Sequence, residues 1–384
     1  MIKIEHPNLS QIVSQHTEAC VEYVTPRLNF CIALFDALGN KNYSPITQSV
    51  QKTIGIEAAT AKAIVKPFIK KRKKNIAIGE IKSAICSKNN HIFVTSSKIN
   101  RYKALYKFFS EVKVSLSSII AGEPEELFSI VTNSIFQLQS DDQVKHCLEL
   151  IFNYDAFVKT GFDQVNGTIW NNYSLTQVLD LSVCPYCNRS WVVTVENNGS
   201  KLTNPQLDHF FSKTDYPLLR LSFYNLIPSC ETCNSRLKGA VEFSIQNNLH
   251  PYIEGYGEEG KFHSIAYDYE SAIGIASNYE IFLETADPLR SEKNDRIREN
   301  HKVFKIDEIY NSHGDIVSEL YRKKSNSNDK YLEILANQFP AANLTKGELY
   351  RMAFGNYYKE NDFKKRPFAK LTKDIAEQLN LIVK

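Results

Sequence analysis

Residues 184–239 decide how this chain is organised, and they read CPYCNRSWVVTVENNGSKLTNPQLDHFFSKTDYPLLRLSFYNLIPSCETCNSRLKG. Two C-x-x-C pairs bracket the stretch, Cys184 with Cys187 and Cys230 with Cys233. A structural zinc ion takes four thiolate or imidazole ligands in a tetrahedron, and two such pairs supply them. The sequence therefore predicts a Zn²⁺ site that joins the two ends of the stretch into one small module.

The two cysteine pairs have two other interpretations, a redox-active dithiol and thiols that are buried by coincidence. A redox site normally has one reactive pair in a βαβ setting, and the sequence shows no sign of that setting. A site with four cysteine ligands is closed, so any chemistry must come from other residues. The remaining cysteines are expected to be small buried apolar residues: Cys20, Cys31, Cys86 and Cys147.

Composition places the chain among ordinary globular proteins. It has 384 residues, of which 43% are hydrophobic and 23% are charged, with a formal net charge of +3. No apolar run reaches the length of a membrane span, and residues 1–6 lack the apolar core of a secretory signal. We therefore expect a cytoplasmic protein with no membrane partner. The charge balance neither requires nor excludes a nucleic-acid partner.

We expect an α+β fold, a mainly helical chain that carries a small zinc-stapled module. Apolar residues recur at helical spacing along 127–152 and 316–321, and again from 331 to 339. The β-favouring run 191–195 and the turn at 197–199 suit a hairpin. These patterns predict three parts: an N-terminal helical region (1–170), the cysteine module (171–255) and a C-terminal helical region (256–384).

A basic run in the N-terminal region has no acidic residue within it: Lys62, Lys66, Lys70, Lys71, Arg72, Lys73 and Lys74. It is either a solvated helix face and turn, which is the more common case, or a patch that contacts phosphates. Clustered cations favour nucleic acid because binding releases condensed counterions.

Between the cysteine pairs, four residues combine into a pattern that an isolated Asp-His pair would not make. Asp208-His209 lie in a short apolar stretch, Asn225-Leu226 precede the second pair, and Asn234 follows its last cysteine. In this order the residues resemble the HNH endonuclease family, whose active site is a ββα-metal fold. The resemblance covers residues 184–251. This sequence has asparagine where the family motif often has a final histidine.

The resemblance implies a metal-dependent hydrolysis of phosphodiester bonds. His209 suits a general base because an imidazole titrates near working pH. In the family the middle asparagine orients that ring, a task that falls here to Asn225. Asp208 and Asn234 offer the hard oxygen ligands that Mg²⁺ or Mn²⁺ prefers.

Other side chains near the pattern have less specific expectations. Three cations are candidate phosphate contacts, although exposed cations are usually only solvated: Lys213, Arg236 and Lys238. Tyr186 and Trp191 are expected to pack against the first cysteine pair and not to stack on bases. His250 is a possible extra ligand.

The central window is also similar to bacterial HNH proteins of anti-phage defence, such as the PtuB-like nuclease subunits of Septu-type systems. That resemblance implies a DNA substrate and an SMC/ABC-like ATPase partner, with the helical regions as docking surfaces. Two alternatives remain open at this stage. The chain could cleave RNA, including tRNA, or it could be a non-catalytic zinc-ribbon module that binds nucleic acid or protein.

Overall fold

The structure is a computed structural model, and it describes eight stretches of the chain. These stretches are residues 1–40, 56–68, 96–164, 167–197, 200–285, 291–326, 331–338 and 343–382. Most of the basic run and Cys86 lie outside them. Within the described stretches, no helix combines the length and the apolar character that crossing a membrane requires.

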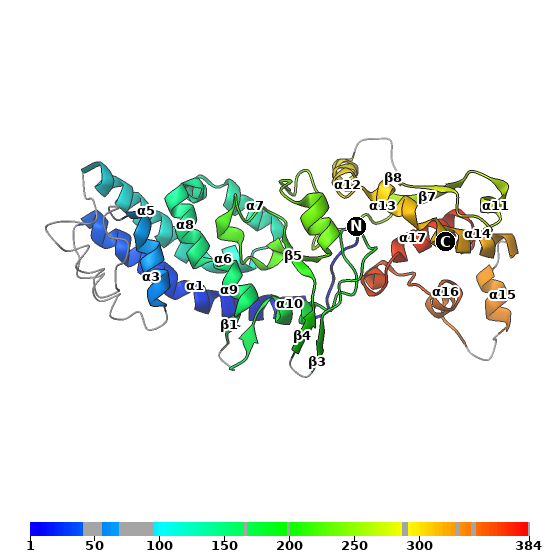
Figure 1. Cartoon of the computed structure of the whole chain (residues 1–384), viewed down its shortest axis with the longest axis horizontal. Coiled ribbons are helices and arrows are strands. Elements are labelled where there is room, and N and C mark those ends of the chain that lie inside the picture. Colours follow the sequence, from blue (N-terminus) through cyan, green and yellow to red (C-terminus); the bar gives the residue numbers. More distant parts are fainter. Residues whose placement is uncertain are drawn as a thin grey trace. The chain divides into compact units, whose positions relative to one another are not determined.

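The chain folds into two compact units (Figure 1). The cysteine unit comprises residues 1–9, 176–210 and 227–384, and the helical unit comprises residues 10–175 and 211–226. The division differs from the three sequential ranges expected above. Residues 227–255 and 256–384 share one unit, and the segment 211–226, from between the cysteine pairs, belongs to the other.

In its described residues, the helical unit consists of helices with one short antiparallel strand pair, β1 with β2. Its elements are α1 (Leu9–Asn40), α3 (Ala58–Val65), η1 (Lys66–Phe68), α5 (Ser96–Val114), α6 (Leu116–Ala121), α7 (Pro124–Thr132), η2 (Ser134–Ser140), α8 (Asp142–Ile151), α9 (Tyr154–Lys159), β1 (Phe162–Asp163), β2 (Ile169–Trp170), η3 (Pro217–Leu219) and η4 (Phe223–Asn225). Helix α10 (Asn172–Leu179) spans the boundary with the cysteine unit.

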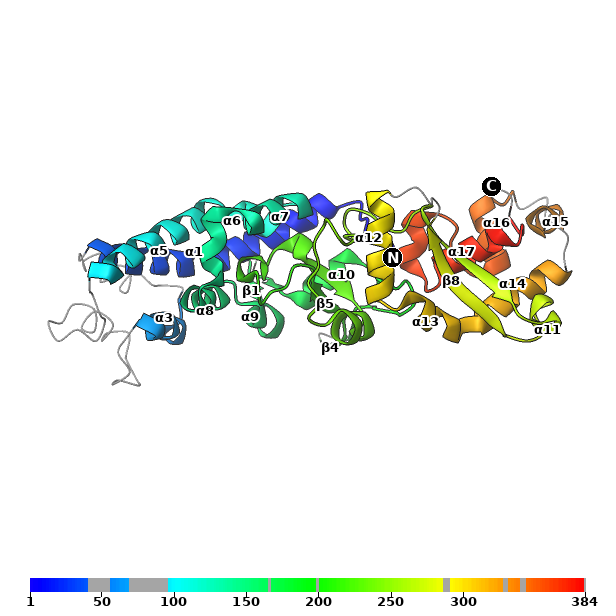
Figure 2. The same ribbon diagram turned by 90° about the horizontal axis from the view of Figure 1, so that it is seen from above.

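Local sequence signals explain several helix limits in this unit. Helix α7 begins with Pro124, whose missing N–H costs nothing in the first turn, and Asn133 ends it in extended backbone. Asp141 caps α8 by accepting from two backbone amides. Helices α1 and α5 lie side by side (Figure 2), and Phe35 of α1 stacks on Phe109 of α5 with ring centres 5.4 Å apart. The helical spacing expected along 127–152 is confirmed for α7 and α8, whereas Ile135 and Leu138 lie between them in the 3₁₀ segment η2 and are exposed.

The cysteine unit mixes short strands with helices. Its elements are β3 (Val195–Asn197), β4 (Ser200–Thr203), β5 (Gln206–His209), β6 (Leu226–Ser229), η5 (Thr232–Lys238), β7 (Gly260–Ala266), α11 (Tyr269–Ala272), β8 (Tyr279–Thr285), α12 (Glu292–Val303), α13 (Ile306–Tyr310), η6 (Asn311–His313), α14 (Gly314–Asn326), α15 (Tyr331–Gln338), α16 (Lys346–Phe354), η8 (Glu360–Lys365) and α17 (Ala369–Gln378). Strands β3 and β4 pair antiparallel, as the turn at 197–199 predicted, and β5 pairs with β6. The chain is mainly helical with small sheets, which agrees with the expected α+β class.

The C-terminal part is not purely helical, contrary to expectation. Strands β7 and β8, of seven residues each, pair antiparallel with Phe262 opposite Leu283. Helix α17 packs against this pair of strands (Figure 2). Alternate residues of β7 are buried, including Phe262 and Ser264. Asp374 of α17 accepts a 3.0 Å hydrogen bond from the Phe262 amide, so a buried side chain replaces a missing sheet neighbour.

Candidate metal centre and active site

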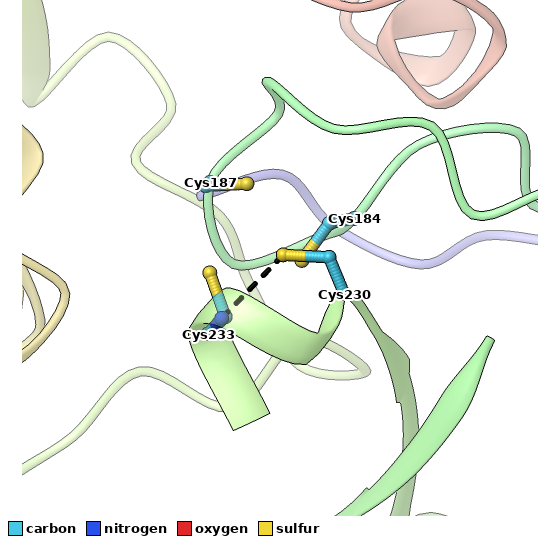
Figure 3. A group of neighbouring side chains, drawn as sticks. All are labelled: Cys184, Cys187, Cys230 and Cys233. Carbon is cyan, nitrogen blue, oxygen red and sulfur yellow. Dashed lines mark hydrogen bonds between the residues drawn. The ribbon is translucent and has the colours of Figure 1, made fainter. Parts of the chain in front are cut away.

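The four predicted cysteines meet in one cluster within the cysteine unit. Their Sγ atoms all lie within 4.8 Å of one another, and Figure 3 shows them grouped around one point. Four sulfurs at the usual Zn–S distance of 2.3 Å would be about 3.8 Å apart, so little adjustment is needed to hold a zinc ion. This donor set fits a structural Zn²⁺, as the sequence predicted.

Each cysteine pair is held in a local turn. In the first, the Asn188 amide donates to the Cys184 carbonyl at 2.8 Å, and Asn188 adopts a left-handed conformation with φ of 48°. In the second, the Cys233 amide approaches Cys230 Sγ at 3.5 Å (Figure 3). Amide donors around sulfur stabilise the thiolate, which is the form that binds metal.

The four thiols strongly influence one another's ionisation. Neighbouring thiols that can hydrogen-bond its sulfur lower the pKa of Cys230, and Cys184 lowers the pKa of Cys187 to about 7. Burial instead raises the pKa of Cys184. Four thiolates this close together would repel one another. A bound Zn²⁺ would supply the charge that lets all four ionise.

The first pair is anchored to the C-terminal part of the same unit. Asn188 donates from its side chain to the Phe363 carbonyl at 3.0 Å and accepts from the Lys370 amide at 3.1 Å. Tyr310 donates to the Cys187 carbonyl at 2.5 Å. Contacts from η8, α13 and the start of α17 thus fix the metal-binding turn from three places along the chain.

Asp208 and His209 both lie on strand β5, and both are largely buried, with exposed fractions of 3% and 7%. Tyr186 donates to Oδ2 of Asp208 at 2.6 Å. Lys238 donates to Oδ1 of Asp208 at 3.0 Å and to the His209 carbonyl oxygen at 2.6 Å. The Asp-His pair is therefore held by Tyr186, from the first cysteine turn, and by Lys238, from the end of the helix η5 that contains Cys233.

This arrangement corrects two assignments made from the sequence. Lys238 is 3% exposed and ion-paired, so its ammonium is not presented to a phosphate. Both oxygens of Asp208 already accept hydrogen bonds, and Lys238 compensates its charge. In this arrangement the Asp208 carboxylate does not fit as a ligand of Mg²⁺ or Mn²⁺.

Asn234 is close to the same strand. Its side-chain amide donates to Oε1 of Gln206 at 2.9 Å, and Ser235 donates to the same oxygen at 2.9 Å. These bonds tie the first residues of η5 to the start of β5, beside the second cysteine pair. Arg236 is 73% exposed on its side chain and forms a surface ion pair with Glu231 at 3.3 Å.

Asn225 and Lys213 belong to the helical unit. The carbonyl of Asn225 accepts from the Phe211 amide at 2.7 Å, and its NH₂ group donates to the Phe211 and Leu219 carbonyls. Asn225 thereby braces the segment 211–225. The ammonium of Lys213 lies 5.0 Å from the centre of the Tyr154 ring, and burial lowers its pKa.

The two aromatic residues of the first turn have different environments. Tyr186 is fully buried and stacks on Phe304 at 4.6 Å, as expected. Trp191 is 57% exposed, so the expectation that it packs against the turn is wrong. His250 is buried against Phe210, with ring centres 4.2 Å apart. The Tyr186–Asp208–Lys238 network was not expected, because the sequence separates its members by 22 and 30 residues.

Comparison with known proteins adds no further assignment. No protein-family model matches the chain, and neither the curated proteins nor the solved structures include a significant match to it.

Proposed function

We propose that this protein is a metal-dependent endonuclease of the HNH type, which hydrolyses phosphodiester bonds in DNA. One observation carries the proposal: the Asp208-His209 strand and the four-cysteine cluster form one buried assembly. Lys238, the last residue of the helix η5 that contains Cys233, donates to the His209 backbone carbonyl at 2.6 Å. A metal-stapled scaffold that fixes one histidine suits catalysis, which requires a side chain held in a set position.

The proposed role of His209 is to take a proton from the attacking water. An imidazole is suited to this because its ordinary pKa lies near neutral pH, so the basic form is present when the enzyme works. The resemblance assigns Asn234 to the metal site. No step is assigned to Asn225, whose side chain is hydrogen-bonded to the backbone of Phe211 and Leu219 within the helical unit. Arg236 is an exposed cation of η5 and is the proposed phosphate contact of that helix.

Two kinds of metal enter the proposal. Zn²⁺ in the cysteine cluster would hold the fold together and take no part in the reaction. The reaction itself is proposed to need Mg²⁺ or Mn²⁺, as in the family that the sequence resembles. Because the Asp208 carboxylate is engaged with Lys238, we assign no step to that ion.

The biological setting is proposed from the resemblance to PtuB-like nucleases. The protein would act in the bacterial cytoplasm against phage DNA, together with an SMC/ABC-like ATPase. RNA cleavage and non-catalytic binding are the competing outcomes. Co-purification with the product of the neighbouring gene would test the ATPase partner.

The activity is tested with supercoiled plasmid and a structured RNA, each incubated with zinc-loaded protein and Mg²⁺ or Mn²⁺. We expect nicking or linearisation of the plasmid that requires the added ion and is lost in His209→Ala. Cleavage of the RNA alone would change the substrate class. Plasmid cleavage that survives His209→Ala would show that His209 is not the base, and binding without cleavage of either substrate would favour the non-catalytic module.

A further inference from the structure

The carboxylate of Asp208 is enclosed by two donors that approach it from different parts of the cysteine unit. Tyr186 reaches Oδ2 at 2.6 Å, and the Lys238 ammonium reaches Oδ1 at 3.0 Å. All three side chains are almost completely buried. A buried charge that is both paired and hydrogen-bonded is tolerated, whereas removal of the oppositely charged partner leaves an uncompensated charge in a dry site.

The two donors come from the two halves of the cysteine cluster. Tyr186 lies between Cys184 and Cys187, and Lys238 is the last residue of η5, the helix that contains Cys233. Lys238 also donates to the His209 carbonyl at 2.6 Å. A change in the separation of the two cysteine turns would therefore be transmitted to strand β5 through both bonds.

Charge argues against a second cation at the same carboxylate. The Lys238 ammonium is already 3.0 Å from Oδ1, and it also lies 5.0 Å from the centre of the Phe243 ring, where it gains a cation–π contact. A divalent ion bound to Asp208 would face this ammonium across one carboxylate. The repulsion between like charges at such distances in a poorly solvated site is large.

We propose that Asp208 is a positioning residue and not a ligand of the catalytic divalent ion. It joins the two halves of the zinc cluster, through Tyr186 and Lys238, to the strand that carries His209. This inference rests on the proposed function for the meaning of His209, and the contacts that carry it are independent of that function.

The first test measures coupling between Asp208 and Lys238 in the zinc-loaded full chain. Zinc release to a chromogenic chelator is followed during urea titration of the wild type, Asp208→Asn, Lys238→Met and the double variant. Each single variant should raise the equilibrium constant for release by a factor on the order of a hundred, because one buried charge is left alone. The double variant should recover much of this loss. If the change in zinc release of the double variant equals the sum of the changes in the two single variants, the proposal is overturned.

The second test separates a positioning role from a ligand role. Binding of Mn²⁺ to the zinc-loaded protein is measured from the electron paramagnetic resonance signal of free Mn²⁺. If Asp208 is not a ligand, Asp208→Asn should change the affinity by less than about threefold, the size of a weak electrostatic effect. A loss of more than about tenfold, as expected when a metal site loses an important group, would overturn the proposal.

Tyr186→Phe provides a milder variant in case the charge substitutions prevent folding. It removes one hydrogen bond and keeps both charges and the buried ring. The variant should retain its zinc, while the pH profile of plasmid cleavage shifts and the NMR titration of the His209 ring moves with it. An unchanged profile and titration would contradict the positioning role.

The two proposals can fail separately. A wild type that cuts no nucleic acid, but shows the coupling between Asp208 and Lys238, would refute the nuclease function and support the positioning role of Asp208. A wild type that cuts DNA through His209, but shows no coupling between Asp208 and Lys238, would refute only the positioning role of Asp208.

Discussion

The Nζ atom of Lys238 lies 2.6 Å from the backbone carbonyl oxygen of His209. A lysine that the sequence offered as a contact for nucleic acid thus binds the protein's own main chain, beside the histidine proposed to act as base. If the Lys238 ammonium moved away, the buried carboxylate of Asp208, its other partner, would lose its compensating charge. The pair therefore links the second cysteine turn to the candidate active site.

A cysteine variant and a histidine variant should distinguish the residues that hold the structural zinc from the residue proposed for catalysis. We expect Cys187→Ser to lose the zinc and to unfold the cysteine unit, because metal binding and folding are coupled in such sites. His209→Ala should keep about one zinc per chain. The measurement is elemental analysis of the purified protein, combined with circular dichroism.

The matched control is Cys147→Ala, which changes a buried cysteine of the helical unit that lies outside the cluster. It should retain the zinc. Equal zinc loss in Cys187→Ser and Cys147→Ala would contradict the assignment of the ligands.

His16 makes the stability of the helical unit depend on pH. Its Nδ1 accepts from the Trp170 indole N–H at 3.0 Å, so Nε2 carries the proton and donates to the Leu221 carbonyl at 2.7 Å. Burial lowers the pKa of His16 to about 4, from 6.5 in the unfolded chain. Since the folded state binds the proton less readily, this stability is present above pH 6.5 and is lost as pH falls toward 4.

The expected loss between pH 7 and pH 4 is about 2–3 kcal/mol of unfolding free energy. Urea titrations of the wild type and His16→Gln at both pH values isolate this contribution from that of the carboxylates. The difference between the two proteins should shrink by that amount at pH 4. A difference that stays constant with pH would show that His16 does not titrate in this way.

A second buried ion pair should contribute strongly to the stability of the cysteine unit. Lys370 and Asp374 are both buried in α17, with Nζ 3.0 Å from Oδ2, and Asp374 also accepts from the Phe262 amide. Asp374→Ala leaves that lysine and that amide without their partner, so it should cost about 3–5 kcal/mol in urea unfolding.

Asp362→Ala removes a partner of the more exposed ion pair with Lys365 and serves as the control. It should cost less than about 1 kcal/mol. Similar costs for Asp374→Ala and Asp362→Ala would mean that burial of the first pair has been overstated.

Arg236, in the last turn of η5, offers a test of nucleic-acid contact. Its side chain is exposed, so Arg236→Ala should weaken DNA binding equally for different sequences and lower the salt slope of the affinity by about 1. Glu231→Ala, which frees Arg236 from its ion pair, should not weaken binding. Fluorescence anisotropy over a range of salt concentrations measures both, and an unchanged slope in Arg236→Ala would exclude the phosphate contact.

The sequence predicted the features that repeat or pair over short distances. The C-x-x-C spacing located the four-cysteine cluster, and the asparagine-rich stretch at 197–199 indicated the β3–β4 strand pair. The network of Tyr186, Asp208 and Lys238 could not be predicted, because it depends on which distant residues the fold brings together. The sequence does not reveal whether an Asp or a Lys side chain faces solvent or forms a buried ion pair.

The β7 and β8 strands were not predicted, although their sequence carries a signal for them. The strands alternate buried and less buried residues, as in Tyr279 and Ile281 of β8, but the glycines at 255, 257 and 260 suggested only a loop. The exposure of Trp191 had no such signal. Trp191 is 57% exposed although it closely follows the first cysteine pair in the sequence.

The most direct test of the account is single-turnover cleavage of plasmid DNA with Mn²⁺ by zinc-loaded wild type and zinc-loaded His209→Ala. General-base catalysis typically contributes about 10²–10⁴-fold, so the variant should be slower by that factor while its zinc content stays the same. Equal cleavage rates for the two proteins at equal zinc content would contradict the account.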